Sequence, residues 1–191
     1  MNKSTLYRSW QTLYDAIISC TECPLCQGIQ SKVPGQGNPG ARLMLIGEGP
    51  GAQEDQQGLA FVGAAGQLLT RMLSAIGLTR EDVFIANIVK CRPPGNRQPS
   101  PEEAQRCLPF LRSQVALIKP EVILLLGATA LQHTISADAR ITGARGHWVH
   151  RGAVWMLPTY HPAALLRDPA KKQDAWQDLQ MVRDKLRELA S

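Results

Sequence analysis

Apolar residues follow two alternating patterns along the chain: short continuous runs, and longer stretches in which they recur every three or four residues. The short runs are bounded by turn-forming residues and predict buried strands at residues 42–47, 83–89, 121–127 and 153–158. The helical spacing predicts amphipathic helices at residues 4–19, 66–76, from 100 onward and at 172–189. Because strands and helices alternate, we expect an α/β fold, a three-layer αβα sandwich with a central four-stranded parallel sheet.

Length and composition set broad limits. The 191 residues suit a single domain, 1–191, with the N-terminal helix 4–19 and a cysteine-rich loop at 20–40 packed on it. The most apolar run, 122–131, is about half of the ~20 residues that a membrane span needs, and the N-terminus lacks a signal-peptide pattern. We therefore expect a cytoplasmic protein. The net charge of +5 permits a polyanionic partner without identifying one.

Three chemically distinctive segments follow predicted strands: GEGPG at 47–51, NIVKC at 87–91 and HPAALL at 161–166. Ligands of open parallel sheets bind beyond the carboxyl ends of the strands, so we expect these segments to converge. The glycine-rich segment lacks both the GxGxxG of dinucleotide-binding folds and the Gly-Lys-Ser/Thr of phosphate-binding loops. Its bare backbone predicts a close approach to another kind of ligand.

Four of the five cysteines form two separated pairs. Cys20 and Cys23 make a CxxC, whereas Cys91 and Cys107 lie far downstream. Four thiolates can hold a tetrahedral zinc ion or an iron–sulfur cluster, and the spacing does not distinguish the two. The alternative is a redox dithiol with two buried structural cysteines. Cys26 is a fifth candidate.

Several motifs in order resemble the family 4 uracil-DNA glycosylases. They are GEGPG with a following ED and FVGAAGQLL, then NIVKCRPPGNRQPSPEE, then HPAALLR, and the resemblance spans about residues 20–168. It implies an αβα sandwich and a [4Fe–4S] cluster on Cys20, Cys23, Cys91 and Cys107. It also implies removal of uracil from single- or double-stranded DNA, for which we expect a monomer. Cys26 has no counterpart, and Leu59-Ala60 replaces the common Arg-Pro.

The resemblance and the chemistry of base removal assign a role to each motif. Phe61 would stack on a flipped base, Asn87 would read its edge with one donor and one acceptor, and His161 would donate to uracil O2. Glu48 would position water or stabilise the cationic sugar. The glycines Gly47 and Gly49 would let the backbone approach the base.

Weaker expectations concern the surroundings. Glu54 would support the site from behind, whereas Asp55 is expected to be a solvated charge. Leu165 would fill the gap left by the flipped base and Arg167 would contact a phosphate. Asn96 lies on the proline-rich loop, near DNA or near the cluster. The remaining histidines are expected to be surface or structural residues: His133, His147 and His150.

Two rival functions stay open. One is a glycosylase for another modified base, which would be expected to change Asn87, Phe61 or the loop at residues 52–60. The other is a non-catalytic iron–sulfur or zinc nucleic-acid-binding module, which needs the cysteines but has no use for Glu48, Asn87 and His161.

Overall fold

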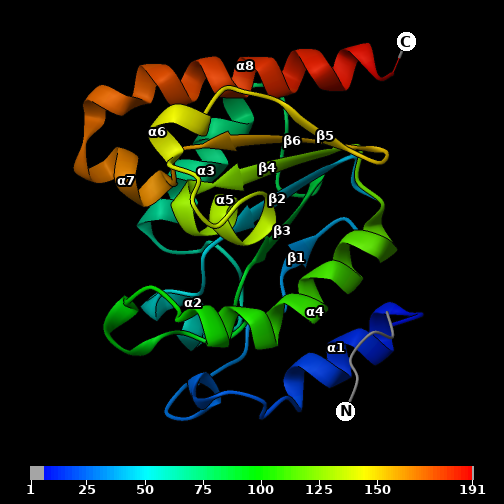
Figure 1. Cartoon of the computed structure of the whole chain (residues 1–191), viewed down its shortest axis with the longest axis vertical. Coiled ribbons are helices and arrows are strands. Elements are labelled where there is room, and N and C mark those ends of the chain that lie inside the picture. The colour runs from blue at the N-terminus through cyan, green and yellow to red at the C-terminus, as the bar shows by residue number, and fades with distance from the viewer. Residues whose placement is uncertain (1–6, 191) are drawn as a thin grey trace.

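A single six-stranded sheet forms the centre of the computed structural model, which describes residues 7–190 (Figure 1). The strand order is β1-β3-β2-β4-β6-β5. The strands are β1 (Gln36–Gly37), β2 (Leu43–Gly47), β3 (Val83–Asn87), β4 (Val122–Leu126), β5 (Val149–Arg151) and β6 (Val154–Thr159). The inner four, β3-β2-β4-β6, are parallel, which confirms the four-stranded parallel centre expected from the apolar runs.

Two short edge strands, which the sequence did not predict, extend this parallel centre. β1 pairs antiparallel with β3, and β5 pairs antiparallel with β6, so the sheet is mixed. β1 has two residues and β5 has three; all five are at least partly exposed, and Val149 is the one apolar side chain among them. Segments this short show no apolar periodicity, which is why the hydrophobic pattern did not indicate them.

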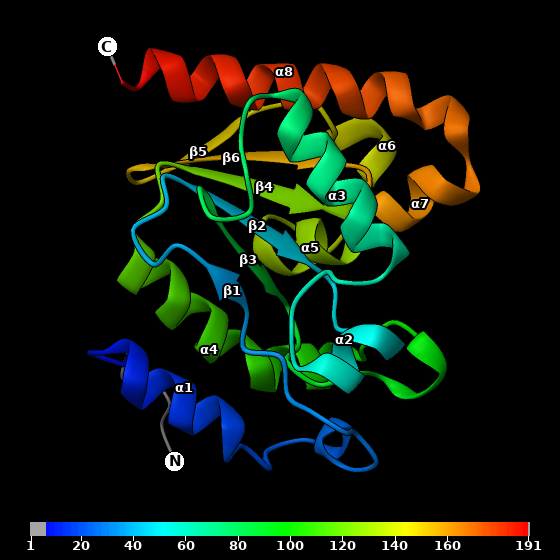
Figure 2. The same cartoon turned by 180° about the vertical axis from the view of Figure 1, so that it is seen from behind.

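Helices cover both faces of the sheet. They are α1 (Trp10–Ile18), α2 (Ala52–Gln57), α3 (Ala64–Ala75), α4 (Pro101–Ile118), α5 (Gly127–Thr134), α6 (Ile141–Ala144), α7 (Pro162–Arg167) and α8 (Lys172–Glu188). Short 3₁₀ turns lie at Pro24–Cys26, Pro94–Asn96 and Pro169–Lys171. Figure 1 shows α8 along one side of the sheet and α4 with α1 along the other, and α3 is seen in front of the sheet in Figure 2.

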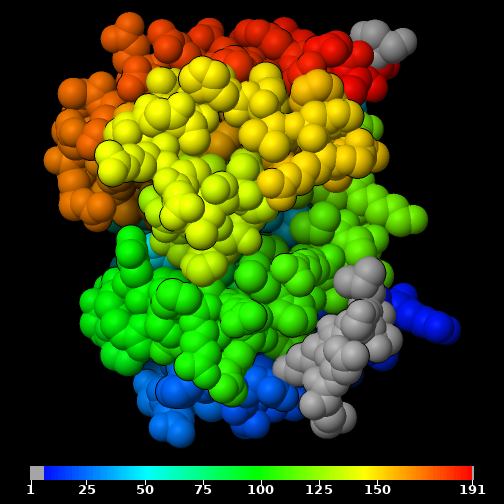
Figure 3. All heavy atoms as spheres, in the orientation of Figure 1, coloured from blue at the N-terminus to red at the C-terminus, as the bar shows by residue number. Residues whose placement is uncertain are grey.

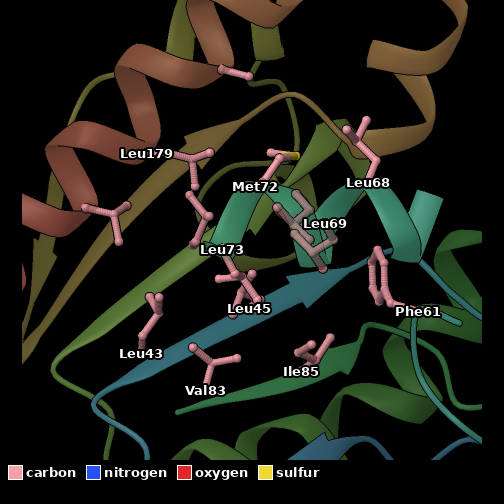
Figure 4. Close-up of a cluster of buried hydrophobic side chains, with 14 of the residues drawn as sticks. Leu43, Leu45, Phe61, Leu68, Leu69, Met72, Leu73, Val83, Ile85 and Leu179 are labelled. Atoms are coloured by element: carbon pink, nitrogen blue, oxygen red, sulfur yellow. The ribbon is translucent and has the colours of Figure 1, made fainter. Parts of the chain in front are cut away.

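Alternation along the strands produces the two layers of core. On β2, Leu43 and Leu45 belong to the cluster that includes side chains of α3 and α8, while Met44 and Ile46 belong to the cluster that includes α1 and α4. Figure 4 shows the first cluster, with Phe61 at its end beside the carboxyl end of β2. The strands β2, β3 and β4 are buried along their whole length and β6 is buried over residues 156–159, as expected for a parallel sheet covered by helices.

Most helix boundaries follow the local signals. Ser100 caps α4 in a capping box with Glu103, and Pro109 is accommodated inside this helix, which continues to Ile118. The N-terminal helix begins at Trp10 rather than near residue 4, with Ser9 as its cap; part of the expected span, residues 4–6, lies outside the described residues. Within residues 7–190 no helix has the length and apolarity needed to cross a membrane.

Candidate active site

A cavity of about 560 Å³ opens at the carboxyl ends of the parallel strands. The loops after β2, β3, β4 and β6 all contribute to its wall, as the strand topology predicts. The residues expected from the sequence that line it are Glu48, Gly49, Glu54, Phe61, Asn87, Asn96, His161 and Arg167. In Figure 3 the yellow segment meets the green segment along a boundary across the face shown, and both segments contribute residues to the cavity wall.

Asn87 is the last residue of β3, and its side chain is only 1 % exposed. Neither the Oδ1 nor the Nδ2 atom of this amide has a hydrogen-bond partner among the described residues. Buried amides are almost always bonded, because an unpaired buried polar group costs about 1–3 kcal/mol. The amide lines the cavity, so a ligand there would supply both missing bonds.

Gly47 leaves room for the side chains of Asn87 and Phe61, which pack against its backbone. A Cβ atom at this position would lie 2.5 Å from Asn87 Oδ1 and 2.6 Å from Phe61 Cζ. Any larger residue would therefore displace both side chains. Gly49 is similarly confined, because its Cβ would lie 2.8 Å from Val89 Cγ2. The glycines of this loop are explained by close packing of the cavity wall.

Phe61 is held in an unusual backbone conformation beside the cavity. Its φ is +53°, a region that non-glycine residues rarely adopt. The Arg80 guanidinium donates to the carbonyl oxygens of Ala60 (2.6 Å) and Phe61 (3.1 Å), and Gly66 leaves room for the Phe61 carbonyl. The Phe61 ring lies 5.6 Å from the His161 ring, with an interplanar angle of 32°. An aromatic face is thus fixed at one side of the cavity.

The Glu54 carboxylate is hydrogen-bonded to the segment that follows Phe61. Its carboxylate accepts bonds from the backbone N–H groups of Val62 and Gly63 (both 2.8 Å) and from Gly51 (3.1 Å). These bonds tie the loop after β2 to the segment after Phe61; the supporting role of Glu54 stays a prediction. The expectation for Asp55 was wrong: this carboxylate is 3 % exposed and accepts from the backbone N–H groups of Gln30 and Ser31.

Glu48 follows β2 directly and faces the cavity. The Thr129 hydroxyl, in the first turn of α5, donates to Glu48 Oε2. The sequence did not indicate Thr129, although its place just after β4 is a signal that could have found it. This bond fixes the direction of the carboxylate at the point where the loops after β2 and β4 meet.

His161 is the N-cap of α7, and its Nδ1 accepts from the backbone N–H of Ala163 (3.2 Å). Burial lowers the pKa of His161 to about 4, so the ring is neutral near pH 7. Because Nδ1 is the acceptor, the proton is assigned to Nε2. Gly127, with φ +88°, packs against this residue, and a Cβ there would lie 2.9 Å from His161 Cβ.

Leu165 and Arg167, the two residues of α7 that were expected to contact DNA, lie in different surroundings. Arg167 lines the cavity. Leu165 does not fit that role, because it is 2 % exposed and belongs to the hydrophobic core. The neighbouring Leu166 is 43 % exposed and is the apolar residue that α7 presents to solvent. On the proline-rich loop, Asn96 lines the cavity and accepts from Arg92 Nε (2.8 Å).

A second, small cavity gathers all five cysteines: Cys20, Cys23, Cys26, Cys91 and Cys107. Burial, reinforced by the neighbouring thiols, raises the pKa of Cys91 to about 12, and burial raises that of Cys107 to about 11. Among residues 7–190, no three His, Cys, Asp or Glu side chains are arranged to hold one metal ion. In a [4Fe–4S] cluster each cysteine binds a different iron, so its ligands need not converge on one point.

One cavity at the carboxyl ends of the parallel strands thus gathers an aromatic ring, a neutral imidazole, a carboxylate and a buried amide without a partner among the described residues. The sequence pattern of the Uracil DNA glycosylase superfamily matches residues 34–180, and the chain belongs to this superfamily. Within it, the chain is similar to the type-4 uracil-DNA glycosylases of Pyrobaculum aerophilum (45 % identical over 179 residues, 90 % of this chain and 91 % of the relative) and Thermotoga maritima (46 % over 158 residues, 81 % of each). The type-5 uracil-DNA glycosylase of Thermus thermophilus is 31 % identical over 150 residues, 68 % of each chain.

Proposed function

We propose that the protein is a monofunctional DNA glycosylase that flips uracil out of DNA and hydrolyses its N-glycosidic bond, the first step of base excision repair of deaminated cytosine. The observation that carries this proposal is the buried Asn87 amide, which lacks partners among the described residues and faces the same cavity as Phe61, Glu48 and His161. Similarity to type-4 uracil-DNA glycosylases over most of the chain supports it.

Selection of uracil follows from the two unmatched groups of Asn87. The Nδ2–H group donates to uracil O4, and Oδ1 accepts from N3–H. Cytosine presents an amino group and a bare N3 at these positions. The Nδ2–H donor would then face another donor, and the Oδ1 acceptor would face another acceptor. The Phe61 face stacks on any planar base and adds affinity without selecting. Flipping costs a few kcal/mol of unstacking, which these contacts offset.

Cleavage requires the N1–C1′ bond to break with its electron pair leaving on the base. Negative charge then grows on uracil, and the neutral His161 is placed to stabilise it by donating Nε2–H to O2. Positive charge grows on the sugar, facing the Glu48 carboxylate that Thr129 orients. Glu48 positions a water whose oxygen bonds to C1′; the water gives a proton to the Glu48 carboxylate, which returns it to solvent, and the departing uracil anion takes up a proton from solvent.

Cys20, Cys23, Cys91 and Cys107 would hold a [4Fe–4S] cluster. Their convergence on one cavity fits an all-sulfur donor set. Cys26 lines the same cavity, and we assign it no ligand role because it has no counterpart in the family motifs. When bound, the cluster supplies structural anchoring. Cys91 lies four residues beyond Asn87, so the cysteines fix the segment that follows the base reader. The monomeric state and the cytoplasmic location stay predictions from the sequence.

The rival functions are less well supported. A non-catalytic binding module offers no reason for Glu48, Asn87 and His161 to share a cavity. A glycosylase for another base would need a different pattern of donors and acceptors from the one that Asn87 offers, although the altered Leu59-Ala60 segment lies next to Phe61.

The direct test uses oligonucleotides with one uracil, thymine or cytosine, followed by alkaline cleavage of abasic sites. We expect cleavage at uracil alone, with Glu48→Gln slowing the single-turnover rate by about 10²–10⁴-fold. Asn87→Ala should also lose most of the activity. Lys119→Met, a change at an exposed helix end, is the matched control. Absence of uracil excision by iron-loaded protein would refute the proposal, and excision of another base would favour the first rival.

A further inference from the structure

Lys90 is the one Lys or Arg residue among the described residues that is buried, with 2 % of its surface exposed. It lies three residues beyond Asn87 and next to Cys91, and it lines the cysteine cavity. Neither base recognition nor cluster ligation, as argued above, requires a lysine at this position. A buried ammonium is costly unless its charge is compensated, so its presence needs an explanation.

The side chain of Lys90 bonds to the base-reading strand. Its Nζ donates to the main-chain carbonyl of Asn87 (2.8 Å) and to Gln114 Oε1 (2.7 Å). Gln114, in α4, donates in turn from Nε2 to the carbonyl of Pro34 (2.6 Å). The lysine therefore holds the end of β3 against α4 and the segment that precedes β1. Any shift of its ammonium would move the Asn87 backbone from which the reading amide projects.

The charge of Lys90 is unmatched by a carboxylate. Both of its acceptors are neutral oxygens, and no Asp or Glu of residues 7–190 forms an ion pair with it. The ionisable group that faces it is the thiol of Cys107, and the backbone N–H of Lys90 also donates to that sulfur. Compensation must then come from the cysteine side, where bound thiolates carry negative charge.

We propose that Lys90 is a positioning residue that links the cysteine cavity to base reading: its ammonium offsets the negative charge of a thiolate-bound cluster while fixing the carbonyl of Asn87. The inference rests on the proposed function, since it assumes that Asn87 reads the base. It assigns a role to Lys90, a residue that contacts neither the base nor the iron. It explains why a cluster distant from the reacting bond would matter for recognition of the base.

Two substitutions separate the charge of Lys90 from its hydrogen bond. Lys90→Met removes both, whereas Lys90→Gln removes the charge but keeps a donor that can reach the Asn87 carbonyl. The measurements are the cluster absorbance near ~400 nm, the cluster reduction potential, and affinity for strands with either cytosine or the hydrolysis-resistant 2′-fluoro-2′-deoxyuridine. Lys119→Met serves as the exposed control.

Both Lys90 variants should shift the potential to more negative values, because a nearby cation stabilises the reduced cluster. Lys90→Met should also lose at least about tenfold of the preference for uracil over cytosine, as expected for a lost bond from a charged donor. Lys90→Gln should keep most of that preference. If Lys90→Met does not fold, Lys90→Gln alone decides through its shifted potential and retained preference.

The coupling is refuted if Lys90→Met keeps both the native potential and the native uracil preference. It is also refuted if Lys90→Gln loses as much preference as Lys90→Met, or if only one of the two properties responds to Lys90→Met. Asn87→Ala in the same binding assay separates the two hypotheses. Retained uracil preference in that variant would overturn the proposed function itself, whereas its loss leaves the Lys90 result as a test of coupling alone.

Discussion

The two cavities of this protein differ in how far the polypeptide completes them. In the base cavity, Glu48, Glu54 and His161 each have a protein partner that fixes their direction, whereas the buried Asn87 amide has no hydrogen-bond partner among the described residues. In the cysteine cavity, burial raises the pKa of Cys91 and Cys107 far above neutrality, so these thiols are protonated unless a cation binds them.

The difference indicates two kinds of preorganisation. The fold already orients the polar side chains of the base cavity, so binding of a base requires little reorganisation of these groups. The cysteine cavity offers a donor set whose final arrangement depends on the group that it binds. Substitutions in the base cavity should change DNA binding and the rate of excision. Substitutions in the cysteine cavity should change folding stability and iron content.

Cys107→Ser should produce the largest effect and should sharpen this contrast. Removal of one ligand would lower the iron content and absorbance near ~400 nm and destabilise the fold, because the binding energy of such a group is folding energy. Uracil excision should fall by more than about 10²-fold as the segment after Asn87 loses its anchor. Thermal unfolding, iron analysis and the oligonucleotide assay measure these changes.

Cys26→Ser is the matched control, since Cys26 lines the same cavity without an assigned ligand role. It should keep the iron and the activity within about twofold. An equal loss of iron in both variants would contradict the ligand assignment.

The pH dependence of stability should reveal the buried His161. Its pKa is about 4 in the folded protein and near 6.5 when unfolded, so the unfolded state binds more protons between these values. This contribution is intact above pH 6.5 and is lost progressively as the pH falls to 4. His161→Gln removes it, so between pH 7 and 4.5 the native protein should lose about 2–3 kcal/mol more stability than the variant.

Urea unfolding of both proteins at each pH provides the measurement. Parallel curves of unfolding free energy against pH would show that His161 is not buried in its neutral form.

Arg80→Met tests the support of the stacking face. Loss of the donors to the carbonyls of Ala60 and Phe61 should release the Phe61 backbone from its φ of +53°. We expect about tenfold weaker half-saturation by uracil-containing strand, with the maximal single-turnover rate changed less than about threefold. Arg71→Met, at an exposed position of α3, is the control. A lower maximal rate at unchanged half-saturation would assign Arg80 to the chemical step instead.

The sequence predicted the elements that place the site, and it missed contacts between distant segments. Glu48, Asn87 and His161 each follow an apolar run, so strand topology alone brings them together. Thr129 and Arg80 act on Glu48 and Phe61 across 81 and 19 residues of sequence, and no local spacing encodes such pairs. Asp55 was misjudged because the backbone donors of Gln30 and Ser31 reach it only after folding.

Leu166→Ala, at an exposed position of α7, should have the smallest effect. Leu165 and Leu166 are adjacent, and a helical turn of about 100° sends the first into the core and the second to the surface, a distinction that composition could not give. If Leu166 fills the gap left by a flipped base, its truncation should slow excision from duplex DNA about threefold. Excision from single strands, where no stack is opened, should not change. Parallel assays of both substrates decide this, with Leu189→Ala, an exposed leucine beyond α8, as the control. Leu165→Ala should instead lower the free energy of unfolding by about 2–5 kcal/mol, because this side chain is buried in the core. Equal slowing on single and double strands by Leu166→Ala would remove this residue from the DNA interface.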